Sequence, residues 1–486
     1  MSDLDPDLLS IQEARDRAKA AKAAQEQWAK ASQELVDRVC AAMAEAGAAA
    51  AADLGAQACA ETGYGVPGHK RLKNLLCTTL LWEHIKDIKT VGVIERDDAR
   101  RLFRVAQPMG VVAALVPSTN PTSTALFKSL IAVKARDAIV ISPHPAAVGC
   151  TGEAARILAD AAVRAGAPEG LVSCLARCTL PGTNELLRHP AVSLILATGG
   201  TPMVRAAHSV GKPAYGVGPG NVPCYVDRSA DLAQAARLLV ASKAFDHSVI
   251  CATEQAAVVD RPVAEAFAQA MAAEGAHFVS EADADALRRT LFRPNGGINA
   301  DTVGKSPQVL GRMAGIAVPD RARILVARLR EVGPGEPLSR EKLTTVLGWY
   351  EADGWQAACE TCLALIAFGG EGHSLALHAR DESVVLAFGL AKPVHRIVVN
   401  TMASLGATGM TTALPPAMTL GPGGVGGAIT GDNIGVRHMF TVKNIAYEIR
   451  PAPPEAMVSG DTPPKAGQPD DLVERIVQRV LADLRS

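Results

Sequence analysis

Cys251 stands in the sequence context best suited to covalent chemistry among the ten cysteines of this 486-residue chain. It follows a helix-like run, LLVASKAF, and a short polar turn from Asp246 to Ser248, and a strand-like run comes after it. A thiol displayed at such a turn is well placed to act as a nucleophile. Cysteine is also among the most buried residue types, so a packing role is the alternative interpretation.

Asn120 is a second candidate, because it follows a continuous apolar run from Val111 to Pro117. With Pro121 directly behind it, Asn120 fits the N-cap position of a helix. Its side-chain amide would also suit the oxyanion that forms when a thiolate attacks a carbonyl group. Crevices at the carboxyl ends of parallel strands bind ligands, which favours the second interpretation slightly.

Glycine-rich turns predict a dinucleotide site. Thr198, Gly199 and Gly200 separate a strand-like run from a helix-like run, and the turn GVGPGN, which contains Gly218, precedes another strand. One G-x-G pattern is weak evidence, since glycines also make ordinary turns. Two such turns in one α/β region strengthen it. A further turn, GGEGHS, carries His373, which is either a structural residue or a catalyst.

Cys359 and Cys362 have the spacing of a zinc or redox pair. They lie in an amphipathic helical stretch, WQAACETCLALIAF, and the sequence holds no second pair at metal-ligand spacing. We therefore expect no metal site. The other cysteines apart from Cys251 are expected to be packing residues.

The surrounding elements indicate an α/β protein. Residues 1–90 are rich in Ala, Glu, Lys and Arg and predict helices, and residues 90–106 predict a hairpin. From residue 111, buried strands alternate with helices, which is typical of a parallel, doubly wound sheet. The alternation resumes after residue 250, with strands expected in RILVAR, TTVLGWY and SVVLAFG. This predicts a second α/β domain.

The balance of charge limits the classes of partner. With 49 basic and 50 acidic side chains the chain lacks the basic excess of a general nucleic-acid binder. No apolar run reaches the roughly 18 residues of a membrane span, and the start of the chain is acidic rather than basic as in a signal peptide. These features predict a soluble protein of a reducing compartment that binds neither nucleic acid nor membrane.

The end of the chain has a separate character. Residues 453–470 have the Pro, Gly and polar composition of a linker, and residues 471–486 place their apolar side chains on one helical face. A helix this short is marginal alone in water. It is expected to pack on its own domain, to form part of a coiled coil, or to bind a partner.

Five motifs, in this order, resemble the aldehyde dehydrogenase superfamily and, within it, the coenzyme A-acylating members: VPSTNPTSTALFKSLIAVKARDAIVISPHPAA, LATGGTPMVRAAHSVGKPAYGVGPGNVP, FDHSVICATEQ, REKLTTVLGWY and GGEGHS. The resemblance covers roughly residues 10 to 450. It implies an aldehyde dehydrogenase fold with a Rossmann-like cofactor domain, a catalytic α/β domain and a β-flap oligomerisation element. The implied parts are 1–245 with the NAD-binding domain and flap strands near 90–106, 246–430 with the catalytic domain, and 431–452 with the rest of the flap.

The resemblance also implies roles for single residues. Cys251 would be the nucleophile, Asn120 and the Cys251 N–H group would hold the oxyanion, and His373 would assist proton transfer or activate coenzyme A. Ser142, Pro143 and His144 would lie at the adenosine, Thr198, Gly199 and Gly200 at the pyrophosphate, Gly218 at the cofactor, and Glu341 at the nicotinamide ribose. The relatives usually have HEKLSP where this chain has Arg340 and Thr344-Thr345. The expected cofactor is NAD, with NADP left open.

One difference from hydrolytic relatives bears on the product. Those relatives carry a Glu that activates water in the segment that reads GVGPGN here, and Val217 stands at about that position. The resemblance therefore implies an acyl-coenzyme A product, with a free acid as the alternative. Propionaldehyde is the expected substrate and acetaldehyde the next. The expected assembly is a homodimer or homotetramer in the bacterial cytoplasm, inside a microcompartment whose shell proteins bind residues 471–486 as an encapsulation peptide.

Overall fold

The computed structural model describes residues 5–457, 479 and 482, so nearly all of the predicted C-terminal helix lies outside the described residues. The described chain forms two units. Unit 1 contains the chain up to Ile94 and from Val105 to Lys443, and unit 2 contains Glu95–Arg104 and the chain from Asn444 onward. All predicted site residues belong to unit 1.

The helices predicted for the first ninety residues are confirmed. Asp5 and Ser32 cap the first two helices, and each accepts a hydrogen bond from a first-turn N–H group. The helical segments of this region are α1 (Pro6–Trp28), α2 (Gln33–Ala49), α3 (Ala51–Thr62), α4 (Pro67–Leu75), a π-helical turn (Leu76–Leu80) and α5 (Leu81–Ile85).

The predicted doubly wound sheet is also confirmed. Its five strands are parallel and run in the order β5-β4-β3-β6-β7, with the first three on one side of the switch point and the last two on the other. Every residue of β3 and β4 is buried, which explains their continuous apolar runs. The elements are β3 (Val111–Val116), α6 (Pro121–Lys134), β4 (Ala138–Pro143), α7 (Val148–Arg164), β5 (Val172–Cys174), α8 (Leu180–Arg188), β6 (Val192–Thr198), α9 (Thr201–His208) and β7 (Ala214–Val217).

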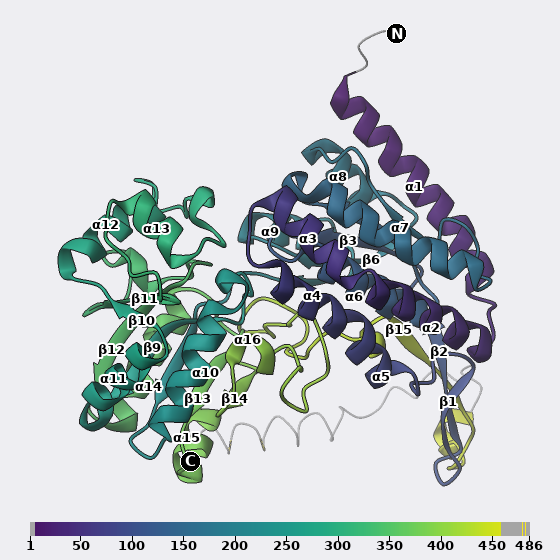
Figure 1. Cartoon of the computed structure of the whole chain (residues 1–486). Helices are drawn as coiled ribbons and strands as arrows, with labels where there is room; N and C mark the ends of the chain where they lie inside the picture. Colours follow the sequence, from purple (N-terminus) through teal and green to yellow (C-terminus); the bar gives the residue numbers. More distant parts are fainter. Residues whose placement is uncertain (1–4, 458–478, 480–481, 483–486) are drawn as a thin grey trace. The chain divides into compact units, whose positions relative to one another are not determined.

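A second parallel sheet has seven strands in the order β10-β11-β12-β9-β8-β13-β14. Figure 1 shows its helices α10 and α14 beside these strands. Its strands are β8 (Val222–Val226), β9 (Glu254–Asp260), β10 (Ala276–Phe278), β11 (Ile324–Arg328), β12 (Val346–Ala352), β13 (Leu375–His378) and β14 (Ile397–Val399). Its helices are α10 (Leu232–Ala244), α11 (Ala264–Ala273), α12 (Glu281–Leu291), α13 (Pro307–Ala314), α14 (Gly354–Phe368), α15 (Glu382–Ala391) and α16 (Ala403–Gly406).

The chain passes from the first sheet to the second between Val217 and Val222, which is earlier than the division at residue 246 that the sequence suggested. β8 precedes that division, yet it pairs with β9 and β13 of the second sheet. The short turn between β7 and β8 therefore connects the two sheets. That turn contains Gly218 and Gly220.

The strand predicted in SVVLAFG is wrong, because these residues lie in helix α15. The Asp381 side chain accepts a hydrogen bond from the Ser383 N–H group and so caps the helix. Val384 and Phe388, one helical turn apart, are buried, whereas Leu386 is exposed. Periodicity alone does not separate a short apolar strand from an apolar helix.

The predicted hairpin near residues 90–106 is present as part of a three-stranded sheet in the order β1-β2-β15. Within unit 2, the Arg101 guanidinium lies 5.0 Å from the centre of the Tyr447 ring, and Arg104 pairs with Glu95 at 2.7 Å. The strands are β1 (Val93–Asp97), β2 (Leu102–Pro108) and β15 (Phe440–Ala446).

Among the described residues, no single helix has both the length and the apolar composition needed to cross a membrane. The bent pair α2 and α3 passes the same test only when its two helices are taken together.

Candidate active site

A cavity of about 410 Å³ lies where the carboxyl ends of β3 and β6 meet the Cys251 loop. This is the place at which an open parallel sheet binds its ligands. Eight of the predicted site residues line the cavity: Asn120, His144, Thr198, Gly199, Gly200, Gly218, Cys251 and Glu341. Three do not line it, namely Ser142, Pro143 and His373.

Cys251 is half-buried at the end of the polar turn that the sequence indicated, just before β9. Burial raises the pKa of its thiol to about 12, and the nearby Glu341 carboxylate adds to the rise. Arg396 and the N–H groups of Cys251 and Ala252 act in the opposite direction. The thiolate is therefore a minor species at neutral pH, and a reaction at Cys251 needs its other partners held close.

The turn before Cys251 has an unusual backbone. Asp246, His247 and Ser248 adopt φ angles of 48°, 48° and 69°, although none is a glycine. Left-handed backbone costs such residues on the order of 1–3 kcal/mol each and persists only where the surroundings impose it. His247 Nδ1 lies 3.0 Å from the Gly304 carbonyl oxygen, and the Asp246 carboxylate accepts the Val66 N–H group.

Asn120 occupies the N-cap position of α6, but its side chain makes no capping bond to that helix. Its Nδ2 atom instead donates to the Val249 carbonyl oxygen at 2.9 Å and to Thr119 Oγ1 at 3.2 Å. Its Oδ1 atom accepts from the Lys73 ammonium group. The side chain thus joins α6 to the Cys251 loop, two residues before the thiol.

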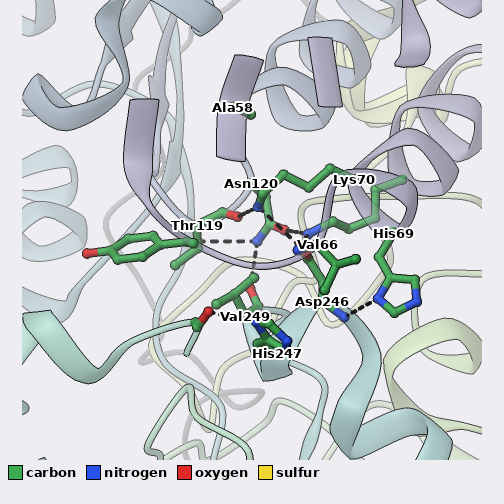
Figure 2. A network of polar contacts seen from close by, with 12 residues as sticks. Ala58, Val66, His69, Lys70, Thr119, Asn120, Asp246, His247 and Val249 are labelled. Carbon is green, nitrogen blue, oxygen red and sulfur yellow. Dashed lines mark hydrogen bonds and ion pairs between the residues drawn. The ribbon is translucent and has the colours of Figure 1, made fainter. Parts of the chain in front are cut away.

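A buried ionic cluster that sequence reasoning missed lies behind Asn120 (Figure 2). The Asp246 carboxylate pairs with Lys73 and, at 3.2 Å, with Lys70, and it accepts the Val66 N–H group at 2.7 Å. Burial by itself would raise the pKa of Asp246, but Lys73 and Lys70 hold it below its usual value. Lys70 and Lys73 are only 2% and 1% exposed.

The signal of this cluster was present in the sequence but had an ordinary explanation. Lys70 and Lys73 stand three residues apart in HKRLKNL, so they share one face of a helix. Lysines in such a pattern usually face water. Only the fold, which buries that face of α4 against the Cys251 turn, separates the two cases.

Glu341 is placed at the cavity by residues of the second sheet region. Its Oε1 atom accepts the Gly220 N–H group at 2.9 Å, and burial raises the pKa of the carboxyl to about 7. Val217 also lines the cavity, at the position where the sequence lacks a carboxylate. The carboxylate beside Cys251 is thus Glu341, tied to the main chain of the GVGPGN turn.

His373 lies in a neighbouring cleft that is lined by α9 and the turn GGEGHS. Its ring and the Cys251 carbonyl oxygen both lie close to Gly220, since a Cβ added to Gly220 would lie 2.4 Å from that oxygen and 3.0 Å from the His373 ring. Burial, with the Arg396 charge, lowers the pKa of His373 to about 3. His373 is therefore a neutral imidazole, with Nδ1 3.1 Å from Ser374 Oγ.

Arg396, which the sequence did not single out, is a buried cation close enough to Cys251 to influence its thiol. It is 2% exposed and donates to the carbonyl oxygens of His373, Gly421 and Gly431 at 2.8, 2.6 and 2.8 Å. These bonds hold the turn that carries His373 against the loop after residue 420.

The residues at the other end of the cavity fit a dinucleotide. Gly199 and Gly200 precede the first turn of α9, whose helix dipole favours a pyrophosphate. A Cβ added to Gly218 would meet no atom within 4 Å, so the space beside it is open. His144 lines the same cavity, whereas the Ser142 hydroxyl is turned to Thr183 Oγ1 at 2.9 Å.

Cys359 and Cys362 both lie on α14 and are buried, as the packing interpretation expects. No group of three or more His, Cys, Asp or Glu side chains within the part of the chain that the structure describes has the geometry to hold a metal ion.

Comparison with known proteins agrees with this geometry. The model of the family described as "Aldehyde dehydrogenase family" matches residues 8–286. Aldehyde-alcohol dehydrogenase 2 of Entamoeba histolytica is 40% identical over 394 residues, which make up 79% of this chain and 45% of that protein. The chain thus spans less than half the length of the curated aldehyde-alcohol dehydrogenases that it matches.

Two solved structures extend the likeness over most of the chain. An acetylating aldehyde dehydrogenase from Geobacillus thermoglucosidasius has a TM-score of 0.92 and 47% identity, and the match covers 93% of this chain and 99% of that one. A propionaldehyde dehydrogenase from the Clostridium phytofermentans fucose utilisation bacterial microcompartment has a TM-score of 0.80 and 26% identity, covering 88% and 96%. The predicted aldehyde dehydrogenase fold is confirmed, and the chain belongs to the aldehyde dehydrogenase family.

Proposed function

We propose that this protein catalyses the NAD-dependent, coenzyme A-acylating oxidation of a short-chain aldehyde: RCHO + NAD⁺ + CoA-SH → RCO-S-CoA + NADH + H⁺. The observation that carries the proposal is the meeting of Cys251 and Asn120 in one cavity with the glycine-rich turns at residues 198–200 and 218. The chain is similar to a protein named as an acetylating aldehyde dehydrogenase, which supports the acylating reaction.

In this mechanism the Cys251 thiolate attacks the aldehyde carbonyl carbon and forms a thiohemiacetal. The oxyanion is held by the Cys251 N–H group and by Asn120 Nδ2. The longer of the two bonds of Nδ2, the 3.2 Å bond to Thr119 Oγ1, is the one that the oxyanion replaces. The 2.9 Å bond to the Val249 carbonyl oxygen keeps the amide in place.

When bound, NAD would supply the acceptor for the hydride of the thiohemiacetal, and loss of that hydride would leave an acyl thioester on Cys251. Gly199, Gly200 and the first turn of α9 would hold its pyrophosphate, and Glu341 its nicotinamide ribose. We propose NAD as the cofactor, with NADP as the alternative. Ser142 and Pro143 would act through the turn that carries His144, since neither lines the cavity.

Coenzyme A then takes the acyl group from Cys251, and the Cys251 thiolate leaves. Water competes poorly because Val217, an apolar side chain, occupies the place where hydrolytic relatives carry a Glu. Glu341 is the carboxylate at this end of the cavity, and its bond to the Gly220 N–H group turns it to a binding role. His373, a neutral imidazole behind Gly220, would assist the proton transfer from the coenzyme A thiol.

We propose propionaldehyde as the preferred substrate, with acetaldehyde as the second candidate. The cavity near Cys251 is lined by Ile250, Met418 and Leu420, which suit a short alkyl group. The likeness to a protein named as a propionaldehyde dehydrogenase supports the first, and the likeness to one named as acetylating supports the second.

We also propose a homodimer or homotetramer that forms through the sheet β1-β2-β15. Six of the seven residues of its edge strand β15 are exposed, and an exposed edge is open to pairing. The similar Clostridium phytofermentans protein comes from a microcompartment. Together with the amphipathic sequence of residues 471–486, this supports a place in the bacterial cytoplasm inside a microcompartment, bound to its shell proteins.

The proposal is tested by NADH formation from C2 to C4 aldehydes with and without coenzyme A. Sustained NADH formation is expected only with coenzyme A, and Cys251→Ala is expected to form none. NADH formation at the full rate without coenzyme A would instead establish hydrolysis to the free acid.

A further inference from the structure

Behind the reactive cysteine, the structure buries more positive than negative charge. Lys70 and Lys73 of α4 are almost fully buried, and among the residues that the structure describes the one acidic side chain that pairs with them is Asp246. Burying ions costs several kcal/mol each, and well-packed apolar residues often serve stability as well or better. A cluster of this composition therefore calls for a role beyond packing.

The two lysines hold different groups. Lys70 Nζ donates to the Thr119 carbonyl oxygen at 3.0 Å, which is main chain. Lys73 Nζ donates to Asn120 Oδ1, which is the side chain that faces the Cys251 loop. Both lysines also donate to Asp246. They are therefore equally buried on the same helix and share one anionic partner, but each orients a different group.

The Lys73 bond fixes which end of the Asn120 amide faces the reaction. An ammonium group has only donors, so its partner on Asn120 must be the oxygen, and the NH₂ group is turned to Val249 and the cavity. A cation on the oxygen also draws electrons from the amide and makes its N–H groups stronger donors. Both effects favour an oxyanion at the cavity side of Asn120.

Asp246 fixes the Lys73 ammonium and the Cys251 turn at the same time. Its carboxylate also accepts the Val66 N–H group at the start of α4, and its own N–H group donates to His69 Nδ1 at 2.8 Å. Gly65, with φ of 79°, passes so close that a Cβ there would lie 2.0 Å from Asp246 Oδ1. These contacts impose the left-handed backbone of the turn that ends at Cys251.

We propose that Lys73 is a positioning residue, which acts through Asn120 by orienting and polarising its amide as the oxyanion donor, and that Asp246 holds Lys73 and the Cys251 turn in register. This inference rests on the proposed function. It assigns to Lys73 a role that Lys70, its neighbour in the same cluster, does not share.

The test is a double-mutant cycle on the rapid first turnover of NADH, in the full-length enzyme with NAD and propionaldehyde. Lys73→Gln is expected to slow this turnover roughly 10-fold to 100-fold, since it weakens one oxyanion donor without removing it. The KM for NAD is expected to stay within about two-fold, because the cofactor end of the cavity is unchanged. In an Asn120→Ala background, Lys73→Gln is expected to cost less than about three-fold.

Lys70→Gln is the matched control. It removes an equally buried lysine that pairs with the same carboxylate, Asp246. We therefore expect a loss of thermal stability similar to that of Lys73→Gln, with a much smaller loss in the rate of the first turnover. Equal losses of rate in the two lysine variants would overturn the proposal. So would an effect of Lys73→Gln that is as large in the Asn120→Ala background as in the wild-type enzyme.

Lys73→Arg keeps the cation and is expected to recover most of the rate, which also covers the case in which Lys73→Gln does not fold. A folded Lys73→Arg enzyme as slow as Asn120→Ala would contradict the assignment. The first turnover precedes the coenzyme A step. Steady-state NADH formation without coenzyme A would therefore refute the proposed function, while the cycle would still decide the role of Lys73.

Discussion

The two ends of the cavity, one at Cys251 and the other at Gly199, Gly200 and Gly218, are held in place in different ways. At the Cys251 end, the groups beside the reacting atoms are held by buried side chains, with Asp246, Lys73 and Asn120 in one chain of bonds. At the end proposed to hold the cofactor, the lining at Gly199, Gly200 and Gly218 is main chain, and the space beside Gly218 is open. A covalent step needs its groups within a few tenths of an ångström, whereas a site whose ligands must leave in each turnover needs room.

Among the variants at the Cys251 end of the cavity, removal of the Asn120 amide is expected to reduce the reaction rate most. Asn120→Ala should slow the first turnover of NADH on the order of 10²-fold to 10³-fold, as for other single oxyanion donors. The KM for NAD should change little. Stopped-flow absorbance of NADH measures both, and a loss that appears mainly in the KM would place Asn120 in binding rather than in the reaction.

A matched pair of glycines compares the two ends within one turn. Gly220→Ala places a methyl group 2.4 Å from the Cys251 carbonyl oxygen, so the loop must move, and a roughly 10-fold or greater fall in kcat is expected. Gly218→Ala adds a methyl group to open space and should mainly raise the KM for NAD. Steady-state kinetics check the pair, and similar kinetic effects of the two variants would remove the distinction between the ends.

The pH dependence of the Cys251 reactivity tests how deeply the Cys251 end of the cavity is buried. Because burial raises its pKa to about 12, its alkylation by iodoacetamide should be slow at pH 7 and should keep rising up to pH 9 and beyond. A free thiol would level off near its ordinary pKa of about 8.5. Peptide mass spectrometry of the Cys251 peptide follows the rate, and a plateau below pH 8 would show a thiolate already stabilised in the free enzyme.

The last prediction concerns stability rather than rate, and it rests on the buried carboxyl of Glu254, three residues after Cys251. Burial raises the pKa of Glu254 to about 7, although Ser242 and the Ala403 N–H group stabilise its anion. The unfolded chain releases this proton near pH 4.5 and the folded one near 7, so the stability from this group is complete below pH 4.5 and falls as the pH rises to 7. The fall is on the order of 2–3 kcal/mol.

Glu254→Gln should therefore flatten part of the loss of thermal stability between pH 5 and pH 7. Glu341, whose pKa is also raised to about 7, contributes in the same range and is kept in the variant. Scanning fluorimetry of the two proteins at both pH values measures the difference. The same pH dependence in wild type and variant would show that Glu254 does not titrate in this range.

The sequence was sufficient for features that depend on local order. The apolar runs of β3 and β4 and the turns at residues 198–200 predicted a doubly wound sheet with a site at its crevice; the sheet is present, and a cavity lies at that crevice. It was insufficient where distant segments meet. The lysines of α4 have the spacing of a solvent-facing pair, and the apolar run of α15 predicts a strand, because burial by another part of the chain decides each case.

The roles of single residues depended on the resemblance rather than on spacing. Cys251 and Asn120 are 131 positions apart in the numbering, and only the fold brings both to one cavity. Ser142 and Pro143 show the opposite case, since the motif marks them but their side chains lie away from the cavity. A motif locates a turn, and the packing decides which of its side chains reach the site.

In the proposed mechanism, Cys251 carries the acyl group between hydride transfer and its transfer to coenzyme A. Intact-protein and peptide mass spectrometry after incubation with propionaldehyde and NAD, without coenzyme A, test it most directly. One propionyl group is expected on the Cys251 peptide, and it should disappear as propionyl-coenzyme A forms when coenzyme A is added. An unmodified Cys251 in an enzyme that has formed one equivalent of NADH, or an acyl group released as propionate, would contradict it.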